Sequence, residues 1–424
     1  MKIAVLGGGF TGLTASYYLS QSNHRVFLYE KEPILGGLSA GFKEKNWLWS
    51  LEKSYHHFFS NDNEVLKLAE ETGFNNIFFQ SPETASLFEH QSSPSNYRTF
   101  PVDTPQDFLA LPILNLVEKI RAGAVIAWLK LSPPLSYYEK ATAKQFLISY
   151  MGNKVWERLW QELFRKKFCK YADKILASFI WARIKKRTKT LGYARGGFQS
   201  FIDYIENKLI DQKVEIKKNY SVSDIEKTGN KFKVNGEMVD LVISTLPTPI
   251  LIKLAKNTLS NNYLNRLKKI NYLHAVSIIL ETEKPLVEKT YWLNINVKEV
   301  PFVALVQHTN MIDKKNYGNH HLLYVANYID STSRLLTMTK EEIIKLYLPF
   351  LKILNPKFSI LNSFLFKSYY AQPVFNREFL ENKPEFITPV KNFYIANLDM
   401  TYPYDRGTNY AIKLGREIGK IVNY

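Results

Sequence analysis

The feature that most constrains the fold is a set of closely spaced glycines near the N-terminus. Gly7, Gly9 and Gly12 stand at GxGxxG spacing, after an apolar stretch that predicts a strand over 1–6 and before a helical pattern over 13–20. Gly7 permits a tight turn, Gly9 lets the backbone approach a pyrophosphate, and Gly12 allows close helix–strand packing. The phosphates would then lie at the positive end of the helix. The stretch therefore predicts a βαβ unit that binds a dinucleotide.

Glu30 supports this prediction. It lies eighteen positions after Gly12 and ends a second apolar stretch, "RVFLYE" over 25–30, which predicts a second strand. An acidic residue at this place accepts hydrogen bonds from the ribose hydroxyls of a dinucleotide. The alternative is that the three glycines only make a tight turn, and the acidic residue favours the dinucleotide.

Composition bounds the class of protein. A chain of 424 residues exceeds a comfortable single core, so we expect two domains, which can be interleaved. Its 46% hydrophobic and 22% charged residues are ordinary for a globular protein. Cys169 is the one cysteine, which excludes an internal disulfide and a cysteine-based metal cluster. Because the eight histidines also lack a ligand pattern with nearby carboxylates, we expect no metal site.

The sequence also bears on localisation. No stretch approaches the roughly twenty apolar residues that a membrane-spanning helix needs. The glycines at 7–12 interrupt the apolar N-terminus, which resembles the first strand of a Rossmann unit more than a secretory signal. We therefore expect a cytoplasmic protein, soluble or peripheral at the inner face of the membrane.

The formal net charge of +17 indicates attraction to an anionic partner. The densest basic segment is 158–189, where eleven Lys and Arg residues stand against two acidic ones. Its apolar residues recur at helical intervals that suit a buried face, so we interpret the cations as a solvated helix face. Attraction to an anionic membrane or an anionic substrate is the second interpretation. We expect no nucleic acid, because no DNA- or RNA-binding signature accompanies the segment.

The pattern of the sequence changes along the chain. Apolar periodicity predicts a helix over 63–72, a mostly helical region over 104–189 and a helix near 340–351. Alternating residues predict a sheet over 272–370, and "LVIS" predicts a buried strand over 241–244. The order of these patterns indicates an α/β chain with a helical insertion.

The C-terminal segment, "NFYIANLDMTYPYDRGTNYAIKL", predicts a strand, a loop and a helix. Gly407 precedes this helix, so the helix N-terminus offers a second place for a phosphate or a polarised ring carbonyl. Two such helix ends indicate a ligand longer than one loop can hold.

A second glycine pair, Gly36–Gly37, follows in "KEPILGGLSAGF". Together with the first loop, the "GG" at 196–197 and "GTNYA" at 407–411, it resembles the flavin-containing amine oxidase superfamily. That superfamily groups protoporphyrinogen oxidases, amine oxidases, carotenoid desaturases and, more distantly, UDP-galactopyranose mutases. The resemblance covers nearly the whole chain and implies an α/β fold. A Rossmann-type FAD-binding domain would be interleaved with an α+β substrate domain that carries a helical insertion.

The resemblance implies a discontinuous domain arrangement. The FAD-binding domain would comprise 1–80, 190–250 and 372–424. The mostly helical insertion of the substrate domain would be 81–189, and its sheet 251–371.

The resemblance also implies FAD as the cofactor and assigns its binding residues. Gly7, Gly9 and Gly12 would hold the pyrophosphate, and Glu30 the adenosine ribose. In a strand expected over 220–223, the backbone of Val222 would face the adenine. The other residues implied to bind FAD are Gly36, Gly37, Leu38, Thr245, Asn397, Arg406, Gly407, Thr408, Asn409 and Tyr410.

Three residues are candidates for a part in the chemistry. The stretch "YHHFF" over 55–59 resembles the loop of UDP-galactopyranose mutases in which a histidine lies by the reactive edge of the flavin. His56 and His57 are therefore candidate catalytic residues. Tyr402 stands where the family often places an aromatic residue against substrate and flavin. For each of the three, the alternative is an ordinary packing role.

The function that the resemblance implies is that of an FAD-dependent oxidoreductase of the protoporphyrinogen oxidase and amine oxidase type. Such an enzyme moves a hydride from a small organic substrate, here anionic or apolar, to flavin N5. The alternative is a non-redox flavoenzyme of the UDP-galactopyranose mutase type, acting on a nucleotide sugar or glycan precursor. The expected partner is a small-molecule substrate, with peripheral contact to an anionic membrane as a further expectation.

Overall fold

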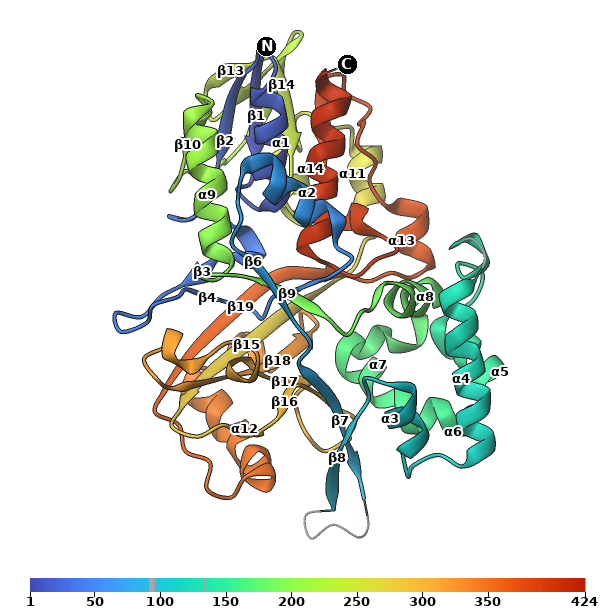
Figure 1. Ribbon diagram of the computed structural model, residues 1–424. Coiled ribbons are helices and arrows are strands. Elements are labelled where there is room, and N and C mark those ends of the chain that lie inside the picture. Colours follow the sequence, from blue (N-terminus) through green and yellow to red (C-terminus); the bar gives the residue numbers. More distant parts are fainter. Residues whose placement is uncertain (91–95, 133–134, 424) are drawn as a thin grey trace.

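A five-stranded parallel sheet forms one end of the molecule (Figure 1). The structure is a computed structural model and describes residues 1–90, 96–132 and 135–423. The inner strands are buried and apolar on both faces, as is usual for parallel strands with helices on either side. In spatial order the strands are β10 (Glu215–Lys217), β2 (Arg25–Tyr29), β1 (Lys2–Leu6), β14 (Leu241–Ser244) and β20 (Phe393–Ile395).

Helices from the two ends and from the middle of the chain pack beside this sheet. They are α1 (Phe10–Ser20), α2 (Asn63–Thr72), α9 (Phe198–Asp211) and α14 (Thr408–Asn423). Two glycines of α14 permit its close approach to α1. A Cβ at Gly415 would lie 2.5 Å from the carbonyl oxygen of Thr11, and one at Gly419 would lie 2.8 Å from the Cβ of Tyr18. The first and last helices of the chain therefore lie side by side (Figure 1).

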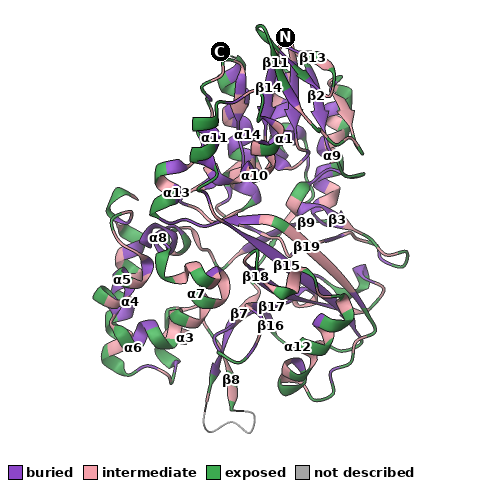
Figure 2. Cartoon of the chain, turned by 180° about the vertical axis from the view of Figure 1, so that it is seen from behind, coloured by how far each residue is buried: buried purple, intermediate pink, exposed green. Residues whose placement is uncertain are grey.

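A mixed seven-stranded sheet forms the centre of the other half. Its order is β19 (Asn362–Pro373), β15 (Tyr272–Thr282), β18 (His321–Ile329), β17 (Ala304–Gln307), β16 (Thr290–Ile295), β7 (Glu83–Glu89) and β8 (Tyr97–Pro101). One face is covered by α12 (Lys340–Leu354), which buries Ile343, Tyr347 and Leu351 in the core on that side. Figure 2 shows that the strands of this sheet are largely buried and that the outer faces of the surrounding helices are exposed.

A helical insertion stands beside the seven-stranded sheet (Figure 1). Its helices are α3 (Pro105–Ala110), α4 (Leu116–Leu131), α5 (Ala143–Met151), α6 (Asn153–Val155), α7 (Gln161–Phe168) and α8 (Ala177–Lys186). Thr104, Asn115 and Thr142 begin α3, α4 and α5 with capping boxes, which satisfy the first N–H groups of each helix. No helix within the described ranges is both long and apolar enough to cross a membrane.

Shorter elements connect these parts. A three-stranded sheet of β5 (Phe58–Phe59), β9 (Leu191–Ala194) and β6 (Ile77–Gln80) lies between the two larger sheets, as does the pair β3 (Gly41–Phe42) and β4 (Leu51–Glu52). The remaining elements are the meander β11 (Ile225–Thr228), β12 (Lys231–Val234) and β13 (Glu237–Val239), and the helices α10 (Thr248–Leu254), α11 (Asn261–Leu267) and α13 (Arg377–Asn382).

The mostly helical range 81–189 begins with two strands, because β7 and β8 join the seven-stranded sheet before the helices begin at Pro105. One expectation from the sequence differs from the structure. The strand expected over 220–223 is absent, since β10 ends at Lys217 and the chain then continues without regular structure. The helix expected over 63–72 and the strand expected over 241–244 are confirmed as α2 and β14.

Candidate functional site

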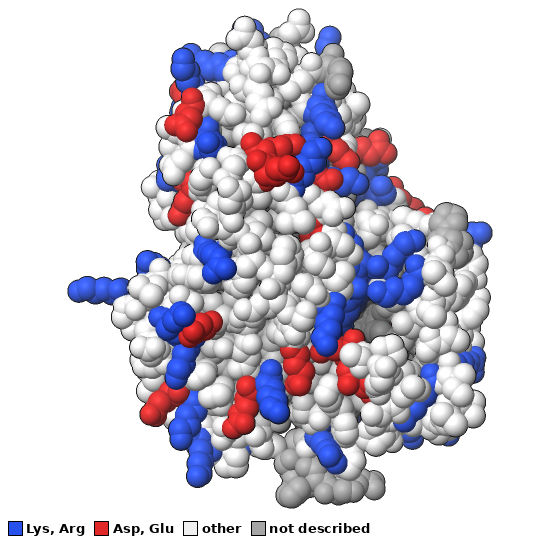
Figure 3. All heavy atoms as spheres, in the orientation of Figure 1, with Lys and Arg blue, Asp and Glu red and all other residues white. Residues whose placement is uncertain are grey.

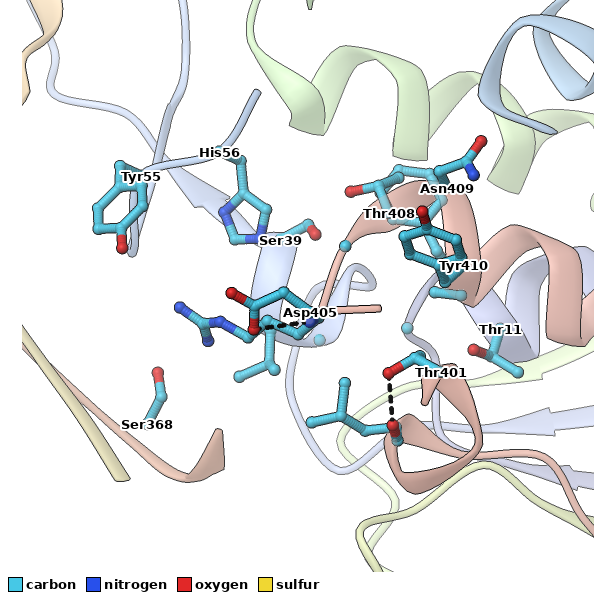
Figure 4. A pocket seen from close by; sticks show the side chains of 18 of the residues that line it. Thr11, Ser39, Tyr55, His56, Ser368, Thr401, Asp405, Thr408, Asn409 and Tyr410 are labelled. Carbon is cyan, nitrogen blue, oxygen red and sulfur yellow. Dashed lines mark hydrogen bonds between the residues drawn. The ribbon is translucent and has the colours of Figure 1, made fainter. Parts of the chain in front are cut away.

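A cavity of about 950 Å³ lies between the two large sheets and the helical insertion. Its walls come from residues as distant in the chain as Leu6 and Leu414. Figure 4 shows part of it, with Tyr55 and His56 on one segment and Thr408, Asn409 and Tyr410 on another. Most of the residues that the sequence implied for FAD line this cavity. They are Gly7, Gly9, Glu30, Gly36, Gly37, Leu38, Val222, Thr245, Arg406, Gly407, Thr408, Asn409 and Tyr410.

The first glycine loop leaves space at the N-terminus of α1. Gly7 has φ +105°, a conformation that favours glycine, and Gly9 is the N-cap of the helix. A Cβ at Gly9 would have only the Cα of Gly37 within 4 Å, at 3.9 Å. A Cβ at Gly12 would instead lie 1.9 Å from the carbonyl oxygen of Gly7. Gly9 thus leaves room for a phosphate at the helix end, whereas Gly12 allows the backbones to pack.

Glu30 lies at the end of β2, beside the loop. One of its carboxylate oxygens accepts a hydrogen bond from the N–H of Gly8 at 2.8 Å, and the other accepts one from the N–H of Glu32 at 3.0 Å. The second glycine pair runs next to it, since the N–H of Gly36 donates to the carbonyl oxygen of Gly8 at 2.8 Å. These bonds fix the acidic side chain where a ribose would meet it.

The end of the loop before α14 and the first turn of that helix hold several buried polar atoms that have no partner among the described residues. These are Nη1 of Arg406, Oγ1 of Thr408 and the hydroxyl of Tyr410. Buried polar atoms without partners are uncommon in proteins, and the residues of these three line the cavity, where a bound molecule would satisfy them. Asn409 differs, because its side-chain oxygen accepts a hydrogen bond from the N–H of Glu64 at 2.9 Å and so holds α2. The space at Gly9 and these unpartnered atoms fit a long, polar cofactor such as FAD.

The two histidines line the cavity as neutral rings. Nδ1 of His56 lies 2.6 Å from the carbonyl oxygen of Ser54, and because a carbonyl only accepts, this nitrogen carries the hydrogen. Nδ1 of His57 lies 3.3 Å from the hydroxyl of Tyr291. Burial lowers the pKa of His56 to about 4, with a further contribution from Arg406. Burial lowers the pKa of His57 to about 3, helped by His56 and two arginines. Neither ring is a cation near neutral pH.

Three predicted site residues lie behind the cavity wall. The hydroxyl of Tyr402 lies 2.9 Å from Oε1 of Glu139 and 2.8 Å from the hydroxyl of Ser178, so it points into the helical insertion. The side-chain amide of Asn397 donates to the carbonyl oxygen of Leu246 at 3.0 Å, within the protein. Gly12 packs on Gly7 as described. In the described structure, none of the three lines the cavity.

The interpretation of the basic segment as a solvated helix face requires correction. On α8 and its C-cap, the cations Arg183, Lys186 and Arg187 line the cavity, on the same helix face as Phe179 and Ile180. Lys167 of α7 lines it as well and pairs with Asp405. In Figure 1, α8 lies at the end of the helical insertion that is nearest to the cofactor half, which is the five-stranded sheet with α1, α2, α9 and α14. A helix face that the sequence suggests is solvated therefore lines a cavity. The i, i+4 spacing of Arg183 and Arg187 signalled that they share a face.

Sequence reasoning did not single out the residues of the aromatic wall that the seven-stranded sheet supplies. Tyr291, Trp292 and Tyr328 line the cavity from β16 and β18. The ring of Trp292 packs edge-on against Tyr55, with ring centres 4.7 Å apart. The alternation of apolar and polar residues predicted that these residues lie in strands. It did not predict that their side chains line a cavity.

The model of one protein family, described as flavin containing amine oxidoreductase, matches residues 10–412. The chain belongs to this family. The match confirms the resemblance drawn from the sequence, a Rossmann-type α/β fold and a flavin cofactor, FAD. The family is one of flavin-containing oxidoreductases.

Individual curated proteins match this flavoprotein over only 30% of its chain. It is 30% identical over 128 residues to 15-cis-phytoene desaturase of Arabidopsis thaliana, a match that covers 30% of this chain and 22% of that protein. It is 27% identical over 133 residues to zeta-carotene desaturase of Zea mays, covering 30% of this chain and 23% of that protein. The chain thus spans about a fifth of the length of the curated relatives it matches.

Solved structures resemble the whole flavoprotein. A putative protoporphyrinogen oxidase from Exiguobacterium sp. has a TM-score of 0.77 at 16% identity, covering 99% of this chain and 98% of that one. Reduced UDP-galactopyranose mutase has a TM-score of 0.77 at 17% identity, and the match covers 100% of this chain and 95% of that one. Putrescine oxidase with bound putrescine has a TM-score of 0.73 at 14% identity, and the match covers 100% of this chain and 99% of that one. At these identities the likeness shows the fold alone.

Proposed function

We propose that this oxidoreductase removes a hydride from a carbon atom of a small organic substrate that binds in the aromatic part of the cavity. A bound flavin supplies the acceptor for that hydride at N5. The observation that carries the proposal is the continuity of the cavity. It runs from the glycine loop at Gly7–Gly9, past the histidine pair, to an aromatic wall at Tyr291 and Trp292.

The side chains along this path suit the positioning of a substrate. The aromatic rings of Tyr55 and Trp292 make one wall, and they exclude water from the carbon that reacts. Nδ1–H of His56 is bound to Ser54, so its Nε2 is left as an acceptor. A neutral imidazole in this place orients a hydroxyl or N–H of the substrate, and it can accept a proton when the hydride leaves.

The alternative is a non-redox flavoenzyme. The likeness in fold to reduced UDP-galactopyranose mutase and the cations in the cavity support it, because a nucleotide sugar carries phosphates. In that case the flavin must be reduced for activity, and the substrate loses no electrons.

Anaerobic mixing separates the two functions. FAD-loaded protein is mixed with prenyl phosphates, porphyrinogens, alkyl amines and nucleotide sugars in turn, and the visible absorption of the oxidised flavin is followed. Under the proposed function, one class bleaches the absorption stoichiometrically and air restores it. The proposal is wrong if no class bleaches it and the dithionite-reduced protein isomerises a nucleotide sugar.

A further inference from the structure

Two arginines of the helical insertion line the cavity. Arg183 lies in the last turn of α8 and Arg187 is the C-cap residue of that helix, one turn further on. Both residues line the cavity, and 39% and 40% of their side-chain surface is exposed. In Figure 3, Lys and Arg side chains gather between the cofactor half and the helical insertion. The two groups are therefore open to a molecule within the cavity.

Neither guanidinium is engaged in a hydrogen bond within the described structure. The nearest carboxylate oxygen to Arg183 is Oδ2 of Asp405 at 3.6 Å, and the nearest to Arg187 is Oδ1 of Asp103 at 3.7 Å. Asp405 already accepts a hydrogen bond from Lys167, and Asp103 accepts one from the N–H of Thr84 at 2.6 Å. The arginines thus keep their donor groups free for a further acceptor.

The charge at this end of the cavity is not balanced. Among the described residues, six cations line it, against three carboxylates. The cations are Lys167, Arg183, Lys186, Arg187, Lys189 and Arg406, and the carboxylates are Asp62, Asp103 and Asp405. A ligand with a negative group would be attracted here, and an alkyl ammonium would be repelled.

The surroundings of the arginines are apolar. Trp160, Phe164, Phe168 and Phe179 line the same end of the cavity from the helical insertion, and Trp292 faces them from β16. A ligand that fills this space needs an apolar body as well as a negative group. The two arginines line the same cavity as His56 and His57, and their charges contribute to the lowered pKa of His57.

We propose that Arg183 and Arg187 form a clamp for an oxyanion, a carboxylate or a phosphate, on a substrate whose body is otherwise apolar. A guanidinium presents its N–H groups in a fork that matches either oxyanion, and two guanidiniums one helical turn apart can hold one group between them. The clamp excludes alkyl amines as substrates, despite the name of the family. That the ligand is a substrate rests on the proposed function; that the clamp binds oxyanions does not.

The test measures binding and needs no turnover. FAD-loaded protein is titrated calorimetrically with n-octyl phosphate, octanoate and octylammonium, which share one apolar chain. We expect both anions to bind and octylammonium not to bind. The ratio of the two anion affinities identifies phosphate or carboxylate as the preferred group. Binding of octylammonium with equal or higher affinity would overturn the proposal.

Variants locate the binding. Arg183→Gln and Arg187→Gln should each weaken octyl phosphate binding roughly tenfold, and the double variant about a hundredfold. Arg334→Gln, on an exposed arginine outside the cavity, is the matched control and should bind as the wild type does. Asp103→Asn should tighten binding, an effect that misfolding cannot produce. If Arg183→Gln/Arg187→Gln has an unchanged flavin spectrum and binds octyl phosphate as tightly as the wild type does, the proposed clamp is wrong.

The two proposals fail separately. If the clamp is right and the hydride transfer wrong, octyl phosphate binds but no substrate class bleaches the flavin. If the hydride transfer is right and the clamp wrong, a substrate bleaches the flavin at the same concentration in the wild type and the double variant.

Discussion

The carboxylate of Glu52 accepts a hydrogen bond from the backbone N–H of Phe198, the first residue of α9, at 2.7 Å. Its second oxygen accepts one from the hydroxyl of Tyr193, also at 2.7 Å. Glu52 is completely buried, and this burial raises the pKa of its carboxyl to about 7. The side chain of Glu52 therefore joins the segment that carries the histidine pair to a helix of the cofactor half. Because its pKa is about 7, its protonation state changes near neutral pH.

Glu52→Gln should change how stability depends on pH. The pKa of Glu52 in the folded protein is raised above its unfolded value of 4.5. The protonated carboxyl therefore contributes to the free energy of unfolding at low pH, and this contribution is lost as the pH rises from 4.5 toward 7. The wild type should therefore lose roughly 2–3 kcal/mol relative to the variant between about pH 5 and about pH 8. Urea denaturation of both proteins at a series of pH values measures this. Parallel curves for the two proteins would contradict the assignment.

The buried histidines should make the protein sensitive to acid. His308 is buried, its Nε2 lies 2.8 Å from the hydroxyl of Tyr317, and burial lowers its pKa to about 3. A pKa below the unfolded value means that the unfolded chain takes up the proton first, so stability falls as pH falls below about 6.5. His308→Gln should reduce this fall by up to about 1.4 kcal/mol per pH unit. Denaturant titrations between about pH 4 and about pH 7 would detect the difference.

Gly9→Ala and Gly12→Ala should separate cofactor binding from folding. A Cβ at Gly9 has open space, so this variant should keep its melting temperature without FAD and bind FAD more weakly, because the methyl occupies the phosphate's place. A Cβ at Gly12 meets the backbone of Gly7 at 1.9 Å, so that variant should lose about 1–3 kcal/mol or more of stability even without the cofactor. Equal effects of both substitutions would contradict these roles.

Tyr402→Phe should affect stability rather than turnover. The hydroxyl is bound to Glu139 and Ser178, away from the cavity, so its loss should cost roughly 1–2 kcal/mol and leave kcat within about twofold. Thermal unfolding and steady-state rates of the variant provide the check. A large loss of kcat with an unchanged melting temperature would restore the catalytic role predicted from the sequence.

Contact of this protein with an anionic membrane stays a prediction. The exposed face of α4 is the surface on which we would test it. Val117, Ile120 and Leu131 are 72%, 61% and 88% exposed on this helix, and Arg121 and Lys130 are exposed beside them. We expect sedimentation with vesicles that contain anionic lipid, and weaker sedimentation of Val117→Ser/Ile120→Ser. Salt should reduce the binding, because the basic side chains contribute to it. Equal sedimentation with uncharged vesicles would argue against an electrostatic contribution.

The cofactor half was predictable from the sequence because its signals are local. The spacing of Gly7, Gly9 and Gly12 depends on backbone contacts within one turn, and "LVIS" at 241–244 forms the strand β14. The substrate half was not predictable in the same way. Periodicity showed that Arg183 and Arg187 share a helix face, but what lies opposite that face depends on how the insertion folds back over the chain.

The place of β1 at the centre of its sheet has a consequence for the order of folding. Ile3 on β1 pairs with Leu241 on β14, although the N-terminal part of a chain leaves the ribosome first. One edge of the first strand therefore stays unpaired until more than half of the protein has been made, and such an edge can pair with other chains. The site closes later still, when α14 docks on α1. The full set of residues that line the cavity therefore exists only after α14 has been made, and a cofactor that binds there stabilises the folded chain by mass action.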